Sequence, residues 1–358
     1  MNKVKIAFLG CGRVAEHYKN ILKSGIVKNF EIIALCDLQK DTAKNFSDYF
    51  KCKIFSSYKE MLNNTNPDLV IILTPSSFHY EQALYCLENK FNTLIEKPPS
   101  LFPSQIEHLD KISNNNNVIA CAAYQNRFNP AVQCLKDAII NNRFGKIVTS
   151  SIRLRWCRYN DYYQDDWHGQ WAKDGGVINQ QAIHHLDTLC WLLGPINKVS
   201  GIGAKRLNKL EAEDTLVSIV EFIDGSLCTI EATTAARPKD FEASISVVAE
   251  KGMAQIGGIA LNKIYEWNFI DSNENDTEIP SKYSQEVESG YGKSHGPLLQ
   301  KIIDGIINKN QISPIPLKET IKTCELVHAI YKSDEIKGWV YLKDKPLSSR
   351  LGVFDGRK

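Results

Sequence analysis

The sequence predicts an α/β fold, in which a parallel sheet covered by helices on both faces is followed by an antiparallel sheet covered on one face. Short apolar runs alternate with helix-spaced segments over the first third of the chain, which is typical of a parallel sheet. Longer runs with strand character follow from about residue 124, and Asp224-Gly225 between two of them is a hairpin signal. A length of 358 residues favours about two domains, which we place at residues 1–123 and 124–358.

Strands and helices alternate along the first domain. We expect strands at Val4–Leu9, Glu31–Cys36, Leu69–Leu73, Thr93–Ile95 and Val118–Ala123. We expect helices at Arg13–Lys23, Lys40–Phe50, Phe78–Lys90 and Pro103–Ser113. The polar stretch Asn114–Asn117 is predicted to be a loop.

The second domain begins with a predicted helix at Pro130–Asn142, which carries proline in its first turn. We expect strands at Lys146–Arg158, Thr215–Ile223, Ser226–Ala232 and Glu242–Glu250. We expect further helices at Val177–Leu193 and Leu317–Lys337. Asp271–Thr277 is predicted to be a polar loop.

Composition excludes several classes of protein. The net charge of +2 argues against nucleic-acid binding, and 43% hydrophobic with 23% charged residues argues against disorder. The ten cysteines form no CxxC pair, so they indicate buried thiols in a reducing compartment and no zinc ribbon. The sequence contains no HExxH motif, so it gives no indication of a metal site. The longest apolar run, Leu69–Leu73, is too short to span a membrane, and the N-terminus lacks a signal-peptide pattern, so we expect a cytoplasmic chain.

A glycine motif, Gly10-Cys11-Gly12-Arg13-Val14-Ala15, lies between the first strand and the first helix. Its small residues allow a tight turn, and its helix N-terminus offers N–H groups to a pyrophosphate. Asp37 ends the second strand at about the spacing expected for a carboxylate on the ribose hydroxyls. No arginine follows it, which favours NAD over NADP. The alternative is that Asp37 only caps a turn.

Two further strand ends carry polar residues, at Thr74-Pro75 and at Glu96-Lys97-Pro98. Ligands of open α/β sheets bind beyond the carboxyl ends of the strands. Lys97 is therefore a candidate to polarise a substrate oxygen. The alternative for both sites is that proline simply ends the strand.

The helix predicted at Val177–Leu193 places Gln180 and His184 four residues apart on one face, with Asp187 three residues beyond. An imidazole that titrates near neutrality suits the acceptance of an alcohol proton during hydride transfer. His185 points about a quarter turn away. The alternative is a surface or core-edge histidine pair.

Arginines and aromatics concentrate between Arg153 and Trp171. Arg155 is a candidate for diphosphate or carboxylate recognition, and Trp167 for stacking on a sugar or uracil. RNA binding is disfavoured because four aspartates cancel the local positive charge. The equally weighted alternative is an ordinary sheet face with a solvated loop.

Several motifs in order resemble the Gfo/Idh/MocA oxidoreductase family: GCGRVA at 10–15, Asp37, TP at 74–75, EKP at 96–98, NRFNP at 126–130, GGVINQQAIHHLD at 175–187 and ETIKTCELVHAIYKS at 319–333. The resemblance implies an N-terminal Rossmann dinucleotide-binding domain and a C-terminal α+β domain with an open-faced, mostly antiparallel sheet. It also implies that the last segment packs back near the first domain and that the sheet buries the interface of a homodimer or homotetramer.

The resemblance assigns the family's catalytic lysine to Lys97 and its catalytic histidine to His184. The family aspartate four residues earlier is Gln180 here, which cannot exchange a proton. The expected cofactor contacts are Gly10, Cys11, Gly12, Arg13, Val14, Asp37, Thr74, Pro75, His79, Glu96, Lys97 and Gln125. The expected substrate contacts are Lys97, Tyr124, Asn126, Arg127, Arg155, Trp167, Asn179, Gln180 and His184.

The segment WHGQWAKDGG and the N-Q-x-x-x-H pattern after it are most similar to family members that act on nucleotide-linked sugars. The resemblance implies NAD-dependent oxidation of the 3-hydroxyl of UDP-N-acetylglucosamine or its uronic acid, for surface polysaccharide or lipid A. It also implies that a 2-oxo acid such as 2-oxoglutarate can recycle NADH in some members. The alternatives are an inositol or free-sugar dehydrogenase, a 3-keto-sugar reductase, and a non-catalytic NAD-binding regulator.

Overall fold

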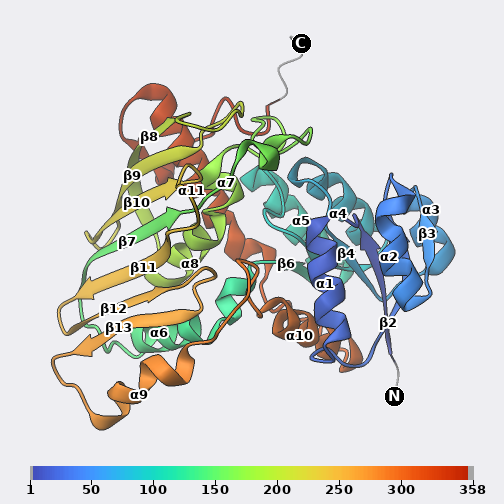
Figure 1. Ribbon diagram of the computed structural model, residues 1–358, viewed down its shortest axis with the longest axis horizontal. Helices are drawn as coiled ribbons and strands as arrows, with labels where there is room; N and C mark the ends of the chain where they lie inside the picture. The colour runs from blue at the N-terminus through green and yellow to red at the C-terminus, as the bar shows by residue number, and fades with distance from the viewer. Residues whose placement is uncertain (1–2, 354–358) are drawn as a thin grey trace. The chain divides into compact units, whose positions relative to one another are not determined.

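The computed structural model describes residues 3–353 and divides the chain into two compact units (Figure 1). The first unit comprises Met1–Gln125 and Lys293–Ile321, and the second comprises Asn126–Gly292 and Lys322–Lys358. A single boundary was expected after residue 123. The structure instead returns residues 293–321 to the first unit, because α10 (His295–Ile307) packs there against α1 and β1.

The first unit is built on a six-stranded, fully parallel sheet of order β3-β2-β1-β4-β5-β6. This order is that of the Rossmann fold, in which the strand order reverses between β1 and β4 while all strands stay parallel. The strands are β1 (Val4–Leu9), β2 (Phe30–Cys36), β3 (Lys53–Phe55), β4 (Leu69–Ile72), β5 (Asn92–Ile95) and β6 (Ala120–Ala122). All four residues of β4 are buried, as expected of a strand covered on both faces.

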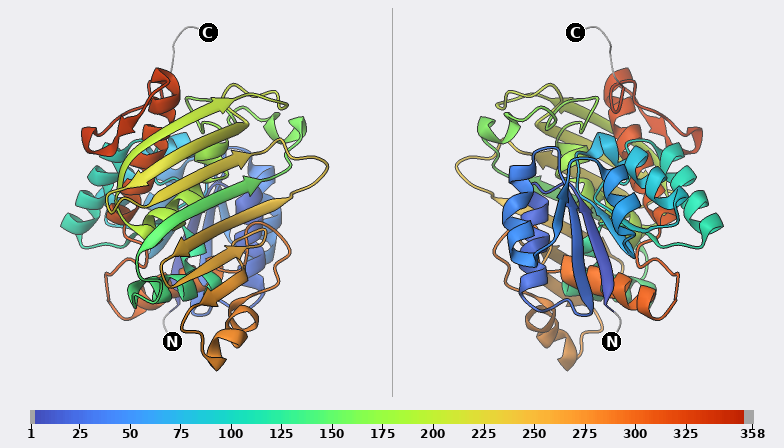
Figure 2. Two further views of the ribbon diagram at one scale, coloured as in Figure 1. Left: turned by 90° about the vertical axis from the view of Figure 1, so that its left-hand side faces the viewer. Right: turned by 90° about the vertical axis from the view of Figure 1, so that its right-hand side faces the viewer.

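Helices lie on both sides of this sheet (Figure 2, right). Besides α10 they are α1 (Arg13–Lys23), α2 (Lys40–Phe50), α3 (Tyr58–Thr65), α4 (His79–Glu88) and α5 (Pro103–Asn116). The bounds expected for α1 and α2 are confirmed to the residue.

Three features of the first unit differ from expectation. The short β3 and the helix α3 were not predicted, although Ser57 and Glu60 form the start of a capping pattern: the Ser57 hydroxyl accepts the Glu60 N–H. Asn114–Asn117 is not a loop, since α5 continues through Asn116. The helix ends at Asn117, which adopts the left-handed conformation that asparagine tolerates.

The second unit is built on an eight-stranded sheet of order β13-β12-β11-β7-β10-β9-β8-β14. Every neighbouring pair is antiparallel except β7 and β10, which run parallel. The strands are β7 (Ile147–Arg155), β8 (Ile196–Ala204), β9 (Thr215–Phe222), β10 (Leu227–Thr233), β11 (Glu242–Ala249), β12 (Gly252–Gly257), β13 (Lys263–Phe269) and β14 (Val340–Tyr341). Asp224 and Gly225 form the predicted β9–β10 turn, with Gly225 at positive φ.

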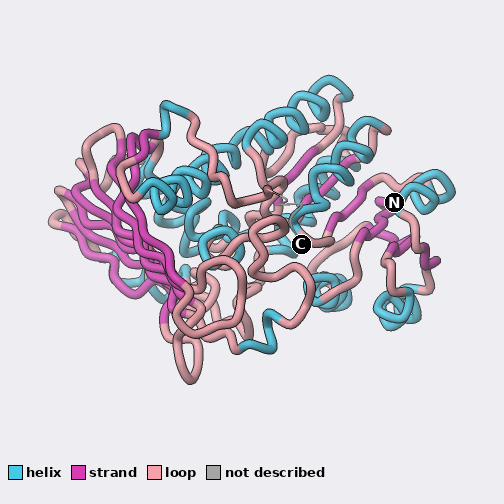
Figure 3. The backbone as a smooth tube through the Cα atoms, turned by 90° about the horizontal axis from the view of Figure 1, so that it is seen from above, coloured by secondary structure: helices cyan, strands magenta, loops and turns pink. Residues whose placement is uncertain are grey.

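Helices cover one face of this sheet and leave the other face open (Figure 2, left; Figure 3). They are α6 (Pro130–Ile140), α7 (Val177–Gln180), α8 (Ile183–Leu193), α9 (Glu274–Tyr283) and α11 (Leu317–Ile336), the last of which begins in residues grouped with the first unit. The expected open-faced, mostly antiparallel sheet is confirmed.

The loop predicted at Asp271–Thr277 is wrong in its second half, where α9 begins. Asn273 caps that helix, and the Asp276 carboxylate accepts a hydrogen bond from the Asn273 N–H, so the two form a capping box.

Over residues 3–353, no helix is both long enough and apolar enough to cross a membrane. The same residues contain no cluster of three or more histidine, cysteine or acidic side chains arranged to hold a metal ion.

Candidate active site

The glycine loop after β1 is shaped by two glycines with different surroundings. Gly10 has a φ of +87°, and a Cβ there would lie 2.8 Å from the backbone of Leu73. A side chain on Gly12 would meet no atom within 4 Å, so the space beside it is open. Gly12 is also the N-cap of α1, and no side chain caps the helix there. The N–H groups of Arg13 and Val14 therefore begin a helix whose positive end is open to an anion.

Asp37 follows β2 directly, as the sequence predicts. Its Oδ2 accepts the Cys11 N–H at 2.8 Å and its Oδ1 accepts the Gln39 N–H at 2.9 Å. Each carboxylate oxygen retains a further lone pair. The turn-capping role and a role as ribose acceptor are thus compatible, and the first holds the carboxylate in place for the second.

The residues of the first unit fit a dinucleotide. The open space beside Gly12 admits a pyrophosphate to the α1 N-terminus, and Asp37 offers acceptors for ribose hydroxyls. In addition, Gln125 Oε1 is buried and has no hydrogen-bond partner among the described residues. A buried acceptor of this kind calls for a bound donor.

His79 connects two of the strand ends on which we expected ligand contacts. Its Nδ1 lies 2.7 Å from the Pro98 carbonyl oxygen, and its Nε2 lies 2.7 Å from the Thr74 carbonyl oxygen. Burial lowers the pKa of His79. The ring thus holds the turn after β4 against the turn after β5, while the Thr74 hydroxyl donates to Gln82.

Glu96 lies directly before Lys97 at the end of β5, and its carboxylate is committed within the first unit. Oε1 accepts the Tyr18 hydroxyl at 3.3 Å and lies 3.6 Å from Nε2 of His295, while Oε2 accepts the Lys97 N–H at 3.1 Å. Burial alone would raise the pKa of Glu96, but the His295 imidazole and the Lys97 amide outweigh it and hold that pKa low. Glu96 thus supports the backbone of Lys97, and its contact with the cofactor stays a prediction.

Sequence reasoning missed the partners of Glu96. His295 begins α10, far along the chain, and no local pattern connects it with β5. Its Nδ1 lies 3.3 Å from Nε2 of His17. Burial, with the neighbouring His295, lowers the pKa of His17 to about 4.

In the second unit, α7 and α8 carry Asn179, Gln180 and His184. Asn179 is buried and its amide donates to the Asp174 carbonyl at 2.7 Å. Gln180 and His184 are half-buried, whereas His185 is 1% exposed. Burial lowers the pKa of His185 to about 4, so it is neutral near pH 7. Of the two adjacent histidines, His184 is the more exposed, and it stays the predicted proton acceptor.

Asp187 lies three residues after His184 on α8, and its carboxylate binds partners from two other segments. The Asp187 carboxylate accepts two hydrogen bonds from the Arg127 guanidinium, each of 2.8 Å, and one of 3.1 Å from the Thr323 hydroxyl. Both charged side chains are almost fully buried. A guanidinium out of water needs a carboxylate partner, so Arg127 serves the core of the second unit instead of offering these nitrogens to a substrate.

Arg155 is likewise engaged in the protein. It lies on β7, where Nε and Nη2 bind the Glu231 carboxylate and Nη1 binds Glu242. The sheet-face alternative therefore describes it better than phosphate recognition. Trp167 is half-buried and packs on His168, with ring centroids 3.5 Å apart, and Asp165 binds the His168 imidazole.

Tyr124 and Asn126 flank the division between the two units. Tyr124 is 1% exposed, and its N–H donates to the Ala122 carbonyl. Asn126 is also buried, and its Oδ1 has no hydrogen-bond partner among the residues that the structure describes. Both remain predicted substrate contacts.

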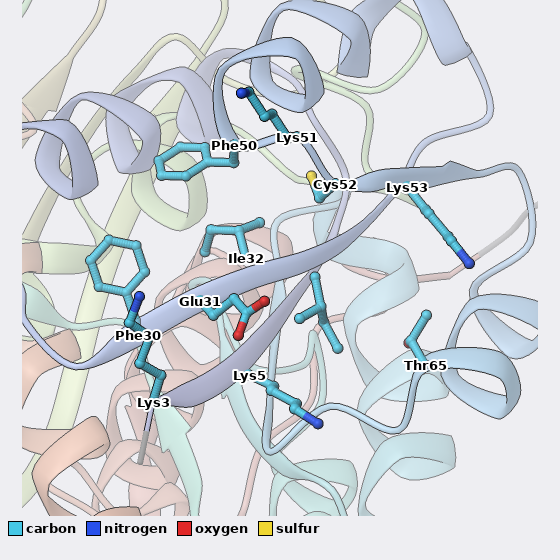
Figure 4. Close-up of a pocket in the computed structure, with 11 residues that line it drawn as sticks. Lys3, Lys5, Phe30, Glu31, Ile32, Phe50, Lys51, Cys52, Lys53 and Thr65 are labelled. Atoms are coloured by element: carbon cyan, nitrogen blue, oxygen red, sulfur yellow. The ribbon is translucent and has the colours of Figure 1, made fainter. Parts of the chain in front are cut away.

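A hollow of about 550 Å³ in the first unit lies at the opposite end of the sheet (Figure 4). It is lined by residues at the amino ends of β1, β2 and β3, among them Lys3, Lys5, Phe30, Glu31, Lys51 and Lys53. The lysine side chains do not converge on one point (Figure 4). Since dinucleotides bind at the carboxyl ends of the strands, this hollow is not the cofactor site.

Comparison with known proteins identifies the family of this chain. Residues 4–124 match the oxidoreductase family with an NAD-binding Rossmann fold, and residues 132–255 match the GFO/IDH/MocA C-terminal domain. The chain belongs to the Gfo/Idh/MocA oxidoreductase family. Its first unit is a Rossmann domain and its cofactor is NAD.

Two solved structures cover nearly the whole chain. The WlbA dehydrogenase of Chromobacterium violaceum, in complex with NADH and UDP-GlcNAcA, is 30% identical, with a TM-score of 0.87 over 95% of this chain and 96% of that one. The WlbA dehydrogenase of Bordetella pertussis, with the same two ligands, is 28% identical, with a TM-score of 0.89 over 95% and 98%.

A curated relative is the D-glucoside 3-dehydrogenase of Escherichia coli K12, which is 25% identical over 252 residues, or 65% of this chain and 70% of the relative. Family and relatives together make this protein an NAD-dependent oxidoreductase that acts on a CH–OH group of a sugar.

Proposed function

We propose that this family member oxidises the 3-hydroxyl of a UDP-linked amino sugar, UDP-N-acetylglucosamine or its uronic acid. The observation that carries the proposal is the end-to-end similarity to two dehydrogenases whose structures contain NADH and UDP-GlcNAcA. The product is a 3-keto sugar nucleotide, and its proposed use is the synthesis of surface polysaccharide or lipid A.

The cofactor is held by the first unit in this proposal. The glycine loop and the α1 N-terminus bind the pyrophosphate, Asp37 binds a ribose, and Thr74, Pro75, His79 and Gln125 border the remainder. NAD supplies, when bound, the acceptor for the hydride that leaves the sugar carbon. Asp37 also accepts the Cys11 N–H, so the same carboxylate holds the glycine loop in place.

Lys97 and His184 act on one sugar hydroxyl in the proposed mechanism. His184 accepts the hydroxyl proton, and the Lys97 ammonium donates a hydrogen bond to the oxygen as negative charge develops there. Proton and hydride leave together, so the alcohol becomes a ketone. Gln180 lies four residues before His184 and can orient a hydroxyl, but the proton passes through His184 alone because an amide does not titrate in this range.

A free sugar is the second candidate substrate, favoured by the relationship to the E. coli D-glucoside 3-dehydrogenase. The two candidates differ in the nucleotide. An enzyme for UDP-sugars devotes part of its binding surface to the diphosphate and uracil, so UDP alone should compete with its substrate.

Two partners belong to the same proposal. A second copy of the chain is proposed to cover the open sheet face, giving a homodimer or homotetramer. A 2-oxo acid is proposed to reoxidise the reduced cofactor, becoming a 2-hydroxy acid as it takes up the hydride and a proton.

Calorimetric titration of the enzyme with NADH bound tests the choice of substrate. We expect binding of UDP-GlcNAcA, weaker binding of UDP, and none of free N-acetylglucosamine at matched concentrations. Binding of a free glucoside together with failure of UDP to bind would transfer the assignment to the second candidate.

A further inference from the structure

The helix α7 begins without a side-chain cap of its own. Its N-cap residue is Gly176, which has no side chain to accept a hydrogen bond. The first N–H groups of a helix have no partner within the helix, and a buried helix start must find acceptors elsewhere. Gly176, Val177 and Ile178 are all buried.

Glu213 supplies two of these acceptors from the segment before β9. Its backbone carbonyl accepts the Val177 N–H at 3.0 Å, and its Oε1 accepts the Ile178 N–H at 3.2 Å. A Cβ on Gly176 would collide with the same carboxylate. The glycine at 176 is therefore required by the acid that caps the helix.

Tyr331 completes the arrangement from α11. Its hydroxyl donates to Glu213 Oε1 at 2.9 Å and accepts the Gly176 N–H at 3.1 Å. Tyr331 is fully buried and Glu213 is 4% exposed. Three segments distant in sequence thus meet at the start of one four-residue helix, and they give partners to the N–H groups of Gly176, Val177 and Ile178.

Hydrogen bonds continue from this start to the turn that carries His184. The Val177 carbonyl accepts the N–H groups of Gln181 and Ala182, at 3.1 and 2.8 Å. The Ala182 carbonyl in turn accepts the N–H groups of His185 and Leu186. A displacement of Val177 is therefore transmitted to both sides of His184.

We infer that Glu213 and Tyr331 are positioning residues for the reaction: they fix the start of α7 and so the placement of Gln180 and His184. The inference rests on the proposed function in so far as His184 is the proton acceptor. Neither residue touches the reacting atoms in this account, so their loss should change the rate of the chemical step and leave NAD binding intact.

The experiment compares Glu213→Ala, Glu213→Gln and Tyr331→Phe with the wild-type enzyme and with a control, Glu211→Gln. Glu211 lies two residues before Glu213, is exposed, and accepts the N–H of Trp171, which precedes α7 in the chain. For each variant we would measure hydrogen exchange of the amides at 176–180, kcat and KM for the UDP-sugar, and the Kd for NAD.

In Glu213→Ala and Tyr331→Phe we expect exchange at 176–180 to accelerate by about tenfold or more. We expect kcat to fall by about tenfold, with the NAD Kd within about twofold of wild type. Glu213→Gln keeps an oxygen for the Ile178 N–H and should recover most of the lost kcat. Glu211→Gln should match wild type in every measurement.

Unchanged exchange in both Glu213→Ala and Tyr331→Phe would overturn the inference, as would faster exchange with an unaltered kcat. If Glu213→Ala does not fold, the exchange and kcat of Tyr331→Phe decide the question. If the wild-type enzyme oxidises no UDP-sugar, the proposed function fails, while the exchange measurements still decide whether Glu213 and Tyr331 hold the helix.

Discussion

Two adjacent histidines, His184 and His185, differ in burial, and the more buried His185 gives a testable pH dependence. His185 is buried, neither ring nitrogen has a hydrogen-bond partner among the described residues, and burial lowers its pKa to about 4. The unfolded chain therefore binds more protons than the folded chain between about pH 4 and the ordinary histidine pKa of about 6.5. The contribution of neutral His185 to the unfolding free energy is fully present above that range and is lost as the pH falls through it.

We predict that His185→Leu removes this acid sensitivity. On lowering the pH from 8 to 5, the wild-type protein should lose roughly 2 kcal/mol of unfolding free energy through His185, a loss that the variant avoids. Turnover should persist, because leucine fills a site where the imidazole makes no hydrogen bond. Urea unfolding at both pH values measures the effect, and an equal loss in the two proteins would contradict it.

Asp37 gives a second test on a single side chain. Asp37→Ala removes both a ribose acceptor and the partner of the Cys11 N–H. We predict that NAD binds about tenfold to a hundredfold more weakly, with kcat at saturating NAD changed by less than about threefold. Fluorescence titration with NAD measures the affinity, and Asp41→Ala, an exposed acid in the first turn of α2, is the control. An unchanged NAD affinity would refute the ribose assignment.

A buried ion pair joins Asp187 of α8 to Arg127, which precedes α6. Removal of one partner leaves an uncompensated buried charge, so Arg127→Met should cost about 3–5 kcal/mol of unfolding free energy. The double variant Arg127→Met with Asp187→Leu should recover a large part of that loss, because it leaves no charge behind. Chemical denaturation of the three proteins checks this. Additive losses would instead indicate that the two residues act separately.

The elements of the first unit could be predicted well because their patterns are local. Apolar strands alternate with amphipathic helices, and glycine and proline mark their ends, as at Gly10 and Pro103. The strand β3 was missed because an edge strand of three residues, none of them fully buried, is too short to give a pattern. The start of helix α9 was missed because its polar residues suggested a loop, although its capping box was present in the sequence.

The candidate site could be predicted in part. Glycine turns and strand-end residues such as Asp37 and Lys97 are readable because their chemistry depends on local position. The partners of Arg127 and Arg155 were not readable, because both lie far away in sequence and only the fold brings them close. The same holds for His295 beside Glu96, and for Tyr331 beside Glu213.

For the whole molecule, the proposed oligomer depends on the open sheet face. Exposed apolar side chains on it are direct cross-strand neighbours, as with Ile202 opposite Val217 and Val248 opposite Met253. Contiguous apolar patches of this kind mark interaction sites. Because a second copy is proposed to cover this face, a charged substitution on its central strands should disrupt the oligomer.

We predict that Ile219→Lys, in the middle of β9 on this face, shifts the protein from an oligomer to a monomer. A lysine in an apolar interface must lose its hydration without gaining a partner. Light scattering after gel filtration gives the mass, and Ile312→Lys, at an exposed apolar residue of the first unit, is the control. A monomeric wild-type protein, or an unaltered mass in Ile219→Lys, would contradict the proposed interface.

The central claim is that Lys97 and His184 carry out NAD-dependent oxidation of a UDP-linked amino sugar. Its most direct test mixes enzyme and NAD in near-equal amounts with UDP-GlcNAcA, UDP-N-acetylglucosamine, a free glucoside or inositol, and follows the absorbance of reduced nicotinamide. Near-stoichiometric enzyme reveals even a single turnover, and added 2-oxoglutarate should then reverse the signal. We predict reduction with a UDP-sugar alone, and none in Lys97→Ala or His184→Asn, although both variants still bind NAD. Reduction only with a free sugar, no reduction with any compound, or near-normal turnover in either variant would contradict the account.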